Sequence, residues 1–336
     1  MNSVSVKIDF PRLRHCTFVI REANEPIIMV IGQDYFEINE EFGSREKFLE
    51  VKRYFDGRHS IKTISEVTGV AEDDVREIVE AFAELGVLRM EEPLEKIPTD
   101  VFLKRIQDSC IMWGRQIGYH RLYGGLERGE YRKEVFLGLI LETYHYVKSA
   151  TKHISVALAH CTNPVWQKIL TEYLQDEHDH EKLFENALVQ MGMPLEWVQN
   201  SHPIIGTMSL TNMLCEIGKA STFAYMACTN LFEAREEDFE NASGAFEQMA
   251  RQYGYDESVI ASVIEHMAGD IEAGHKSLLA QALEETPFVD ADLAHLTVNF
   301  LHDLKHSYDQ FHDQILDYYS DISNYIPRLK VDYFSL

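Results

Sequence analysis

The pattern of apolar and polar positions divides the chain into two parts. Between residues 16 and 38, three short apolar runs (CTFVIRE, PIIMVIG and YFEI) are separated by turn-forming residues, which predicts three short strands. Segments with helical periodicity follow at 44–56, 60–68 and 71–86, and a short VLRM run closes this part. This order of elements predicts a small α+β domain of the winged-helix type over residues 1–95.

From about residue 101 the periodicity is helical throughout. Residues 91–100, EEPLEKIPTD, carry two prolines and few apolar residues, and we interpret them as a linker. Breaks such as Gly124–Gly125 and Asn163–Pro164 divide the rest into about seven or eight predicted helices, without strand-like alternation. The sequence therefore predicts a mainly α protein, with a helical bundle over residues 101–330 behind the small domain.

The charge of the chain limits the classes of partner. The 336 residues carry a formal net charge of −24, and residues 1–95 contain 12 Lys or Arg against 20 Asp or Glu, a net charge of −8. Binding to nucleic acid or to an anionic membrane needs clustered basic side chains, so we expect neither partner. The sequence has neither an apolar run near the roughly 20 residues of a membrane span nor an apolar signal core, which predicts a cytoplasmic protein.

The cysteines give no sign of a disulfide framework. They are odd in number, widely spaced and without a CxxC pair, which also argues against a thiolate zinc site. We expect most of them to be buried as small apolar side chains. The five positions are Cys16, Cys110, Cys161, Cys215 and Cys228.

Fifteen histidines in so acidic a chain favour metal chemistry, because carboxylates and imidazoles are ligands of iron and manganese. In the stretch LQDEHDHEKL, Glu177 and His180 are three residues apart and share one face of a predicted helix. Leu174 and Leu183 lie near the same stripe, so this face is expected to point inward. Helical bundles build iron sites from such inward pairs, whereas the alternative is a solvated charged face.

A second stretch, IEHMAGDIEAGH, offers two pairs of ligands. His266 and Asp270 are four residues apart on one helical face, whereas Glu272 and His275 point roughly the opposite way. Only one pair can face a common centre on a regular helix, and the other pair is then an exposed polar face. A bulge at the neighbouring glycines would bring His275 around.

Two further acids are candidates. Glu233 is the first acid after the uncharged run STFAYMACTNLF, which favours a bridging carboxylate, although it also begins an exposed acidic stretch. Glu142 and His145 lie three residues apart on an aromatic helix and could supply a ligand, a supporting partner or a pocket wall.

Other aromatic and imidazole side chains receive no metal role. Three tyrosines near these stretches could line a pocket or fill the core, namely Tyr144, Tyr146 and Tyr225. The histidines without a paired acid on an apolar face are interpreted as surface or core polar residues, namely His153, His160, His302, His306 and His312.

Two metal-site patterns accommodate these residues. The ferritin-like pattern takes one Glu, one Glu-x-x-His, a second Glu and a second Glu-x-x-His from four helices. It is satisfied by Glu142, Glu177 with His180, Glu233, and Glu272 with His275. The other pattern takes its last ligands from His266 and Asp270 instead.

Residues 105–325 resemble the haem-oxygenase-like diiron oxidases and oxygenases, relatives of thiaminase II and pyrroloquinoline-quinone synthase. In that family one core helix gives Glu and His, a later helix gives Glu, and a final helix gives His-x-x-x-Asp, often with a His three residues on. Here Ala273 stands at that last position, and His275 is the nearest imidazole. The resemblance implies the ligands Glu177, His180, Glu233, His266 and Asp270.

The resemblance also implies an activity. It predicts two Fe(II)/Fe(III) ions per chain, with O2 as co-substrate, in an enzyme of specialised biosynthesis. Expected reactions are N-oxygenation, desaturation or C–C cleavage of an amino-acid-derived or peptide-linked small molecule. Residues 15–90 resemble the winged-helix domains that bind leader peptides as an added strand. The alternatives for this domain are DNA binding, which its charge disfavours, and a role only in packing or dimerisation.

Other functional classes stay open at this point. They are a ferritin-like iron or peroxide protein, a cofactor-free oxidase on the same fold, and a peptide-binding scaffold without catalysis. Thiaminase-type hydrolysis is disfavoured because no cysteine is convincingly placed as its nucleophile. The oligomeric state is open too, although helical domains of this size often form homodimers through helix faces.

Overall fold

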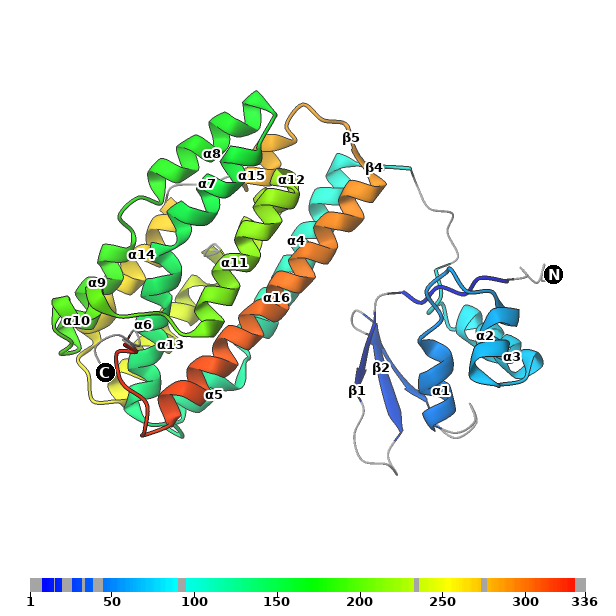
Figure 1. The fold of residues 1–336 in the computed structure, drawn as a ribbon, viewed down its shortest axis with the longest axis horizontal. Helices are drawn as coiled ribbons and strands as arrows, with labels where there is room; N and C mark the ends of the chain where they lie inside the picture. Colours follow the sequence, from blue (N-terminus) through cyan, green and yellow to red (C-terminus); the bar gives the residue numbers. More distant parts are fainter. Residues whose placement is uncertain are drawn as a thin grey trace, which may run out of the picture. The chain divides into compact units, whose positions relative to one another are not determined.

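The computed structural model describes residues 8–14, 16–19, 26–31, 34–38, 45–89, 95–232, 236–272 and 277–329. The chain forms two compact units, Met1–Pro93 and Leu94–Leu336. Each unit has its own hydrophobic core. Figure 1 shows the small unit with its strands and the larger unit of long helices.

The first unit combines an antiparallel sheet with three helices. Strand β2 lies between β1 and β3, and its side chains alternate, with Ile27, Met29 and Ile31 pointing into the core. Of the predicted VLRM strand, the described residues form an isolated antiparallel bridge from Leu88 to Leu13, and Met90 lies outside the described residues. The elements are β1 (Thr17–Val19), β2 (Ile27–Ile31), β3 (Asp34–Ile38), α1 (Arg45–Lys52), α2 (Ile61–Thr68) and α3 (Glu72–Glu84).

The second unit is helical, as the sequence predicts. It also contains a two-stranded antiparallel sheet of β4 and β5, which the predicted linker did not anticipate. Its elements are β4 (Lys96–Pro98), α4 (Thr99–Gly118), α5 (Arg121–Glu127), α6 (Lys133–Lys148), α7 (Ala150–His160), α8 (Pro164–Asp176), α9 (Glu181–Gln190), α10 (Leu195–Asn200), α11 (Ile205–Ala220), α12 (Thr222–Phe232), α13 (Glu236–Gln252), the 3-10 helix η2 (Glu257–Ile260), α14 (Ala261–Glu272), α15 (Leu278–Ala282), β5 (Phe288–Asp290) and α16 (Ala291–Ser320).

The helices are more numerous and shorter than predicted, with thirteen α-helices in the described part of this unit. Some helices do not end at the glycines that the sequence analysis interpreted as helix breaks. Gly124–Gly125 lies inside α5, where the close approach of the Tyr131 ring leaves no room for a Cβ at Gly125. Glycine there serves close packing and not a turn.

Helix α16 runs along the whole helical unit and organises its core. It packs against α4, α6, α11 and α12, and its buried side chains recur with helical spacing, as at Leu301, Leu304, Tyr308 and Phe311. Figure 1 shows α16 alongside α4 and α11. Helix α6 in turn packs against α9, and α9 packs against α14, so these contacts position the turn before α9 and helix α14, which carry candidate ligands.

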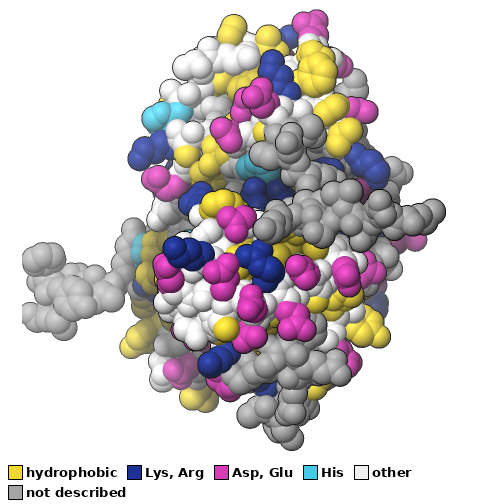
Figure 2. All heavy atoms as spheres, turned by 90° about the vertical axis from the view of Figure 1, so that its right-hand side faces the viewer, with side chains coloured by type: hydrophobic (Ala, Val, Ile, Leu, Met, Phe, Trp, Pro, Cys, Tyr) yellow, Lys and Arg dark blue, Asp and Glu magenta, His cyan; other side chains and the backbone are white. Residues whose placement is uncertain are grey.

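The surface agrees with the acidic composition. On the face shown in Figure 2, carboxylate side chains are spread widely among fewer lysine and arginine side chains. In the described part of the chain, no helix is both long and apolar enough to cross a membrane.

Candidate metal centre

The candidate centre begins at a turn between two helices. Helix α8 ends at Asp176, and α9 begins at Glu181. Asp179, in the turn between them, adopts the left-handed backbone conformation with φ 74°, which a continuous right-handed helix does not allow. Glu177 and His180 therefore lie on a turn, and the prediction that one continuous helix carries both is wrong.

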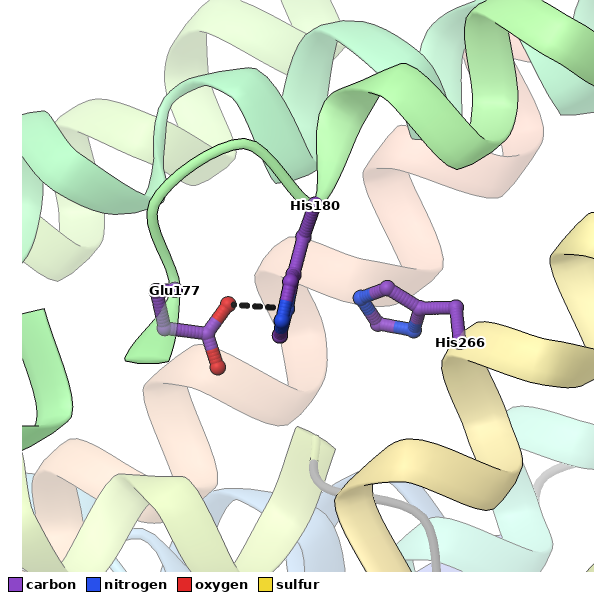
Figure 3. A group of neighbouring side chains, drawn as sticks. All are labelled: Glu177, His180 and His266. Atoms are coloured by element: carbon purple, nitrogen blue, oxygen red, sulfur yellow. Dashed lines mark ion pairs between the residues drawn. The ribbon is translucent and has the colours of Figure 1, made fainter. Parts of the chain in front are cut away.

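The turn nevertheless brings its two side chains together. Oε2 of Glu177 lies 3.2 Å from Nδ1 of His180, and the two side chains are 11% and 30% exposed. From α14, which packs against α9, the ring of His266 approaches His180 edge-on, with ring centroids 5.1 Å apart and planes at 81°. Figure 3 shows the three side chains converging from the turn and from α14.

The electrostatics of His266 suit a metal ligand. Burial and, to a lesser extent, neighbouring His180 lower the pKa of its imidazole, the Glu177 carboxylate opposes both, and the resulting pKa is about 4. The imidazole is therefore neutral near pH 7, which is the form that binds metal ions. The ring of Phe184, one turn into α9, packs at 5.3 Å and 67° against His266 and fixes its orientation.

The three residues fit a single metal ion. One donor atom from each of Glu177, His180 and His266 lies within 4.8 Å of the other two. In a tetrahedral arrangement, ligands at about 2.0–2.2 Å from one ion lie about 3.3–3.6 Å apart, so the three donor atoms would close by no more than about 1.5 Å on binding it. One carboxylate with two imidazoles is the ligand set of non-haem Fe(II) oxygenases. Among the described residues, no other group of three meets this criterion.

The remaining predicted ligands are only partly described. Glu233 and His275 lie outside the described residues. Asp270 and Glu272 belong to α14, but their side chains are also outside the description. Because α14 is helical from Ala261 to Glu272, Asp270 lies on the same helix face as His266.

Glu142 is held in a different place. Its side chain is fully buried, and Oε1 accepts a 2.5 Å hydrogen bond from the Tyr319 hydroxyl. Oε2 accepts from the backbone N–H of Ile204 at 3.2 Å and from the Thr207 hydroxyl. Burial raises the pKa of the Glu142 carboxyl, which these donors oppose. The carboxylate joins α6 to the ends of α11 and α16 and is not part of the three-residue group.

Its neighbour His145 also has another partner, since its Nε2 lies 2.8 Å from the Ser201 hydroxyl. Burial lowers the pKa of His145 to about 3. Tyr144 is fully buried and bonds to Glu185, at 3.2 Å. This part of α6 therefore forms polar contacts inside the bundle.

The sequence missed a set of buried imidazole–phenol pairs. Nδ1 of His153 lies 2.7 Å from the Tyr225 hydroxyl, and Nε2 of His312 lies 3.1 Å from the Tyr123 hydroxyl. Both histidines are almost completely buried. A signal was available for His312, because Tyr308, Ile315 and Leu316, three of the four residues three or four positions away on its helix, are apolar or aromatic. Tyr146 bonds to Tyr308 in the same interior, at 2.6 Å.

Comparison with known structures identifies the fold. A domain of unknown function with a heme oxygenase-like fold, from Shewanella denitrificans, superposes with a TM-score of 0.52 at 16% sequence identity, covering 65% of this chain and 93% of that chain. The helical unit has the haem-oxygenase-like fold. A TenA homolog from Pseudomonas syringae pv. tomato is more distant, with a TM-score of 0.47, 11% identity and coverage of 67% and 100%. A TenA homologue from Pyrococcus furiosus superposes with a TM-score of 0.45 at 14% sequence identity, covering 64% of this chain and 99% of that chain.

Sequence comparison finds a family model that matches part of the chain. The model of the TENA/THI-4/PQQC family matches residues 107–233, a segment that runs from α4 to the end of α12. This haem-oxygenase-like segment includes the turn with Glu177 and His180, whereas His266 follows it. No curated protein matches the sequence.

Proposed function

We propose that the haem-oxygenase-like unit is an iron-dependent enzyme that uses dioxygen to oxidise a small molecule. The observation that carries this proposal is the convergence of Glu177, His180 and His266 into a carboxylate–bis-imidazole set. The family match supports an enzyme in general terms. The use of iron and dioxygen is a more specific proposal, which the carboxylate and the two imidazoles favour.

The protein's part in this chemistry is positioning. The turn between α8 and α9 brings Glu177 against His180, and the ring of Phe184 packs against the ring of His266. Partial burial keeps His266 neutral and limits the access of water. When bound there, ferrous iron supplies the redox chemistry that activates dioxygen.

A second iron ion would need ligands beyond the three described ones. Asp270 lies one turn along α14 from His266, and Glu233 follows directly after α12. We propose these two as ligands of the second ion, in agreement with the His-x-x-x-Asp pattern. The substrate class is an amino-acid-derived or peptide-linked molecule, and the reaction an N-oxygenation, a desaturation or a C–C cleavage.

Anaerobic loading with ferrous iron, followed by exposure to dioxygen, tests the proposal. The natural chain is expected to bind roughly two irons and to consume dioxygen. His266→Ala should lose at least one iron and the dioxygen uptake. His306→Ala, which replaces a histidine on α16 with a 54% exposed side chain, is the matched control and should behave like the natural chain.

The same experiment separates the rival functions. Full iron binding by His266→Ala would instead favour the ferritin-like pattern with Glu272 and His275. A natural chain that binds no iron would leave a cofactor-free oxidase or a scaffold without catalysis. Either result contradicts the proposal.

For the first unit we propose peptide recognition at the edge of strand β3. Within the described residues, β3 pairs with β2 along one side only, and Tyr35 is 71% exposed on it. An extended peptide can add to such an edge as a further strand. Amide exchange in the full chain, with and without a peptide selected from a library for binding, tests this. Slower exchange at Asp34–Ile38 supports the proposal, and unchanged exchange contradicts it.

A further inference from the structure

Two contacts join successive turns of α14 to neighbouring positions of α9. The hydroxyl of Ser262 donates a 2.6 Å hydrogen bond to the backbone carbonyl of Leu183. One turn farther along α14, the ring of His266 packs against the ring of Phe184, with centroids 5.3 Å apart. Because Ser262 and His266 are four residues apart, they lie on the same face of α14. The helix that carries one candidate ligand is therefore attached to α9 at two levels.

The hydrogen bond of Ser262 is of a different kind from those of other helical serines. Serine hydroxyls within helices often bond to the carbonyl four residues earlier in the same helix. Ser155, Ser243 and Ser307 do so in this chain, at distances between 2.6 and 3.1 Å. The hydroxyl of Ser262 instead reaches a different helix. It therefore contributes to the placement of α14 against α9.

Helix α9 is itself held from its other side. The hydroxyl of Tyr144, on α6, donates to the carboxylate of Glu185, on α9, at 3.2 Å. Next to Ser262, Val263 is 3% exposed, and α14 as a whole packs against α9. Ser262 thus bonds α14 to a helix that is already fixed to α6.

We propose that Ser262 is a positioning residue that sets the distance between His180 and His266. Leu183 lies three residues after His180, at the start of α9, so the bond attaches α14 close to the turn that carries Glu177 and His180. Figure 3 shows His266 projecting from α14 toward His180. Metal ligands must be held to within about 0.5 Å of their working geometry, so a shift of α14 along α9 weakens metal binding. The effect on metal rests on the proposed function, whereas the distance between the two rings does not.

The first measurement uses the full chain without metal. With isotope-labelled histidine rings, the nuclear Overhauser effect between His180 and His266 reports the distance between them, and His180→Gln and His266→Gln assign the signals. Ser262→Ala should abolish or clearly weaken this effect, because apolar contacts do not fix a direction as a hydrogen bond does. Ser262→Thr keeps the hydroxyl and should retain the effect. Ser307→Ala is the matched control, since it removes a hydroxyl that bonds within its own helix, and it should also retain the effect.

The second measurement is the binding of Co2+ to the same chains, with Co2+ as a coloured probe of carboxylate and imidazole ligands. Ser262→Ala should bind Co2+ about tenfold or more weakly and show altered visible absorption bands. Ser262→Thr should restore both, and Ser307→Ala should match the natural chain. Chemical denaturation of the metal-free chains shows whether a variant is folded, and Ser262→Cys, with a weaker donor, replaces Ser262→Ala if that variant is not.

The outcomes distinguish this inference from the proposed function. An Overhauser effect that is unchanged in Ser262→Ala, or absent from the natural chain, overturns the inference whatever the chain binds. Unchanged Co2+ affinity in Ser262→Ala overturns its link to metal binding. A natural chain that binds no Co2+ contradicts the proposed metal centre, while loss of the Overhauser effect in Ser262→Ala supports the positioning role even then.

Discussion

At the scale of single residues, the candidate centre depends on a carboxylate and two imidazoles that are all partly buried. Glu177 and His180 come from one turn, and His266 comes from a helix almost ninety positions later. Partly buried carboxylates and imidazoles are costly unless they bind one another or a metal ion. Glu177 and His180 offset part of this cost by pairing with each other, and we propose that a metal ion offsets the rest.

Replacement of Glu177 by Gln should weaken iron binding. The change keeps the size of the side chain but removes the charged oxygen 3.2 Å from His180. We expect affinity for ferrous iron to fall about tenfold or more, measured anaerobically by competition with a chelator. Glu181→Gln, at the first residue of α9, is the control and should leave the affinity unchanged. Equal affinities in the two variants would show that Glu177 is not a ligand.

The buried His153 should make stability depend on pH. Burial lowers its pKa from 6.5 to about 3 in the folded chain, so between these values the unfolded chain binds a proton that the folded chain does not. Its contribution to the free energy of unfolding is then lost as the pH falls from about 6.5 toward 3, with a slope of up to about 1.4 kcal/mol per pH unit. Denaturation of His153→Gln at several pH values should show a shallower decline over this range. An unchanged slope would show that the pKa of His153 is not lowered in the folded chain.

The spacing of Glu177 and His180 in the sequence correctly predicted that their side chains lie close together, but for the wrong structural reason. The separation of three between Glu177 and His180 indicated a shared helix face, and the structure places both on a turn instead. The cause is the positive φ of Asp179, which Asp tolerates better than most residues and which no periodicity reveals. Glu142 had a comparable pattern with His145, yet hydrogen bonds from distant segments hold its oxygens elsewhere.

At the scale of elements, close packing around α6 fixes the interior. A Cβ at Gly138 would lie 2.3 Å from Cγ of Tyr319, the residue whose hydroxyl binds Glu142. Glycine at this position thus allows α6 and α16 to approach each other. The contact also couples the position of α16 to the buried carboxylate.

Gly138→Ala should therefore destabilise the helical unit. Tyr319 would have to move and weaken its bond to Glu142, at a cost of about 1–3 kcal/mol in the free energy of unfolding. Gly244→Ala, in α13 with nothing within 4 Å of the added Cβ, should be neutral or stabilising by up to about 1 kcal/mol. Chemical denaturation of both variants measures the difference. Equal stabilities would contradict this account of the α6–α16 contact.

The sequence predicted element types better than element boundaries. Runs of apolar residues located the three strands and three helices of the first unit to within a few residues, because each run is bounded by turn residues. The sheet of β4 and β5 was missed since its strands are only three residues long and pair across most of the helical unit. Such long-range pairing leaves no local pattern.

At the scale of the whole molecule, the two units have separate cores, and the three described candidate ligands belong to the second. The haem-oxygenase-like fold was predictable from the sequence because the order and separation of its motifs span most of the helical unit. The contacts among helices were not, since they depend on side-chain packing between distant segments. Because the two units have separate cores, we expect iron binding by the second unit not to depend on the first.

A chain of residues 94–336 should bind ferrous iron with the same affinity and stoichiometry as the full chain. All three ligands and Phe184 are retained, and the core of the helical unit does not include residues of the first unit. Metal analysis after anaerobic loading and gel filtration measures this. Loss of iron from a shortened chain with normal helical content would show that the first unit contributes to the site.

Anomalous diffraction at the iron absorption edge, from crystals loaded anaerobically with ferrous iron, tests the central claim most directly. The account predicts an iron peak in contact with Glu177, His180 and His266, and a second peak toward Asp270 and Glu233. Iron bound away from the first three residues, or no ordered iron at all, would contradict it.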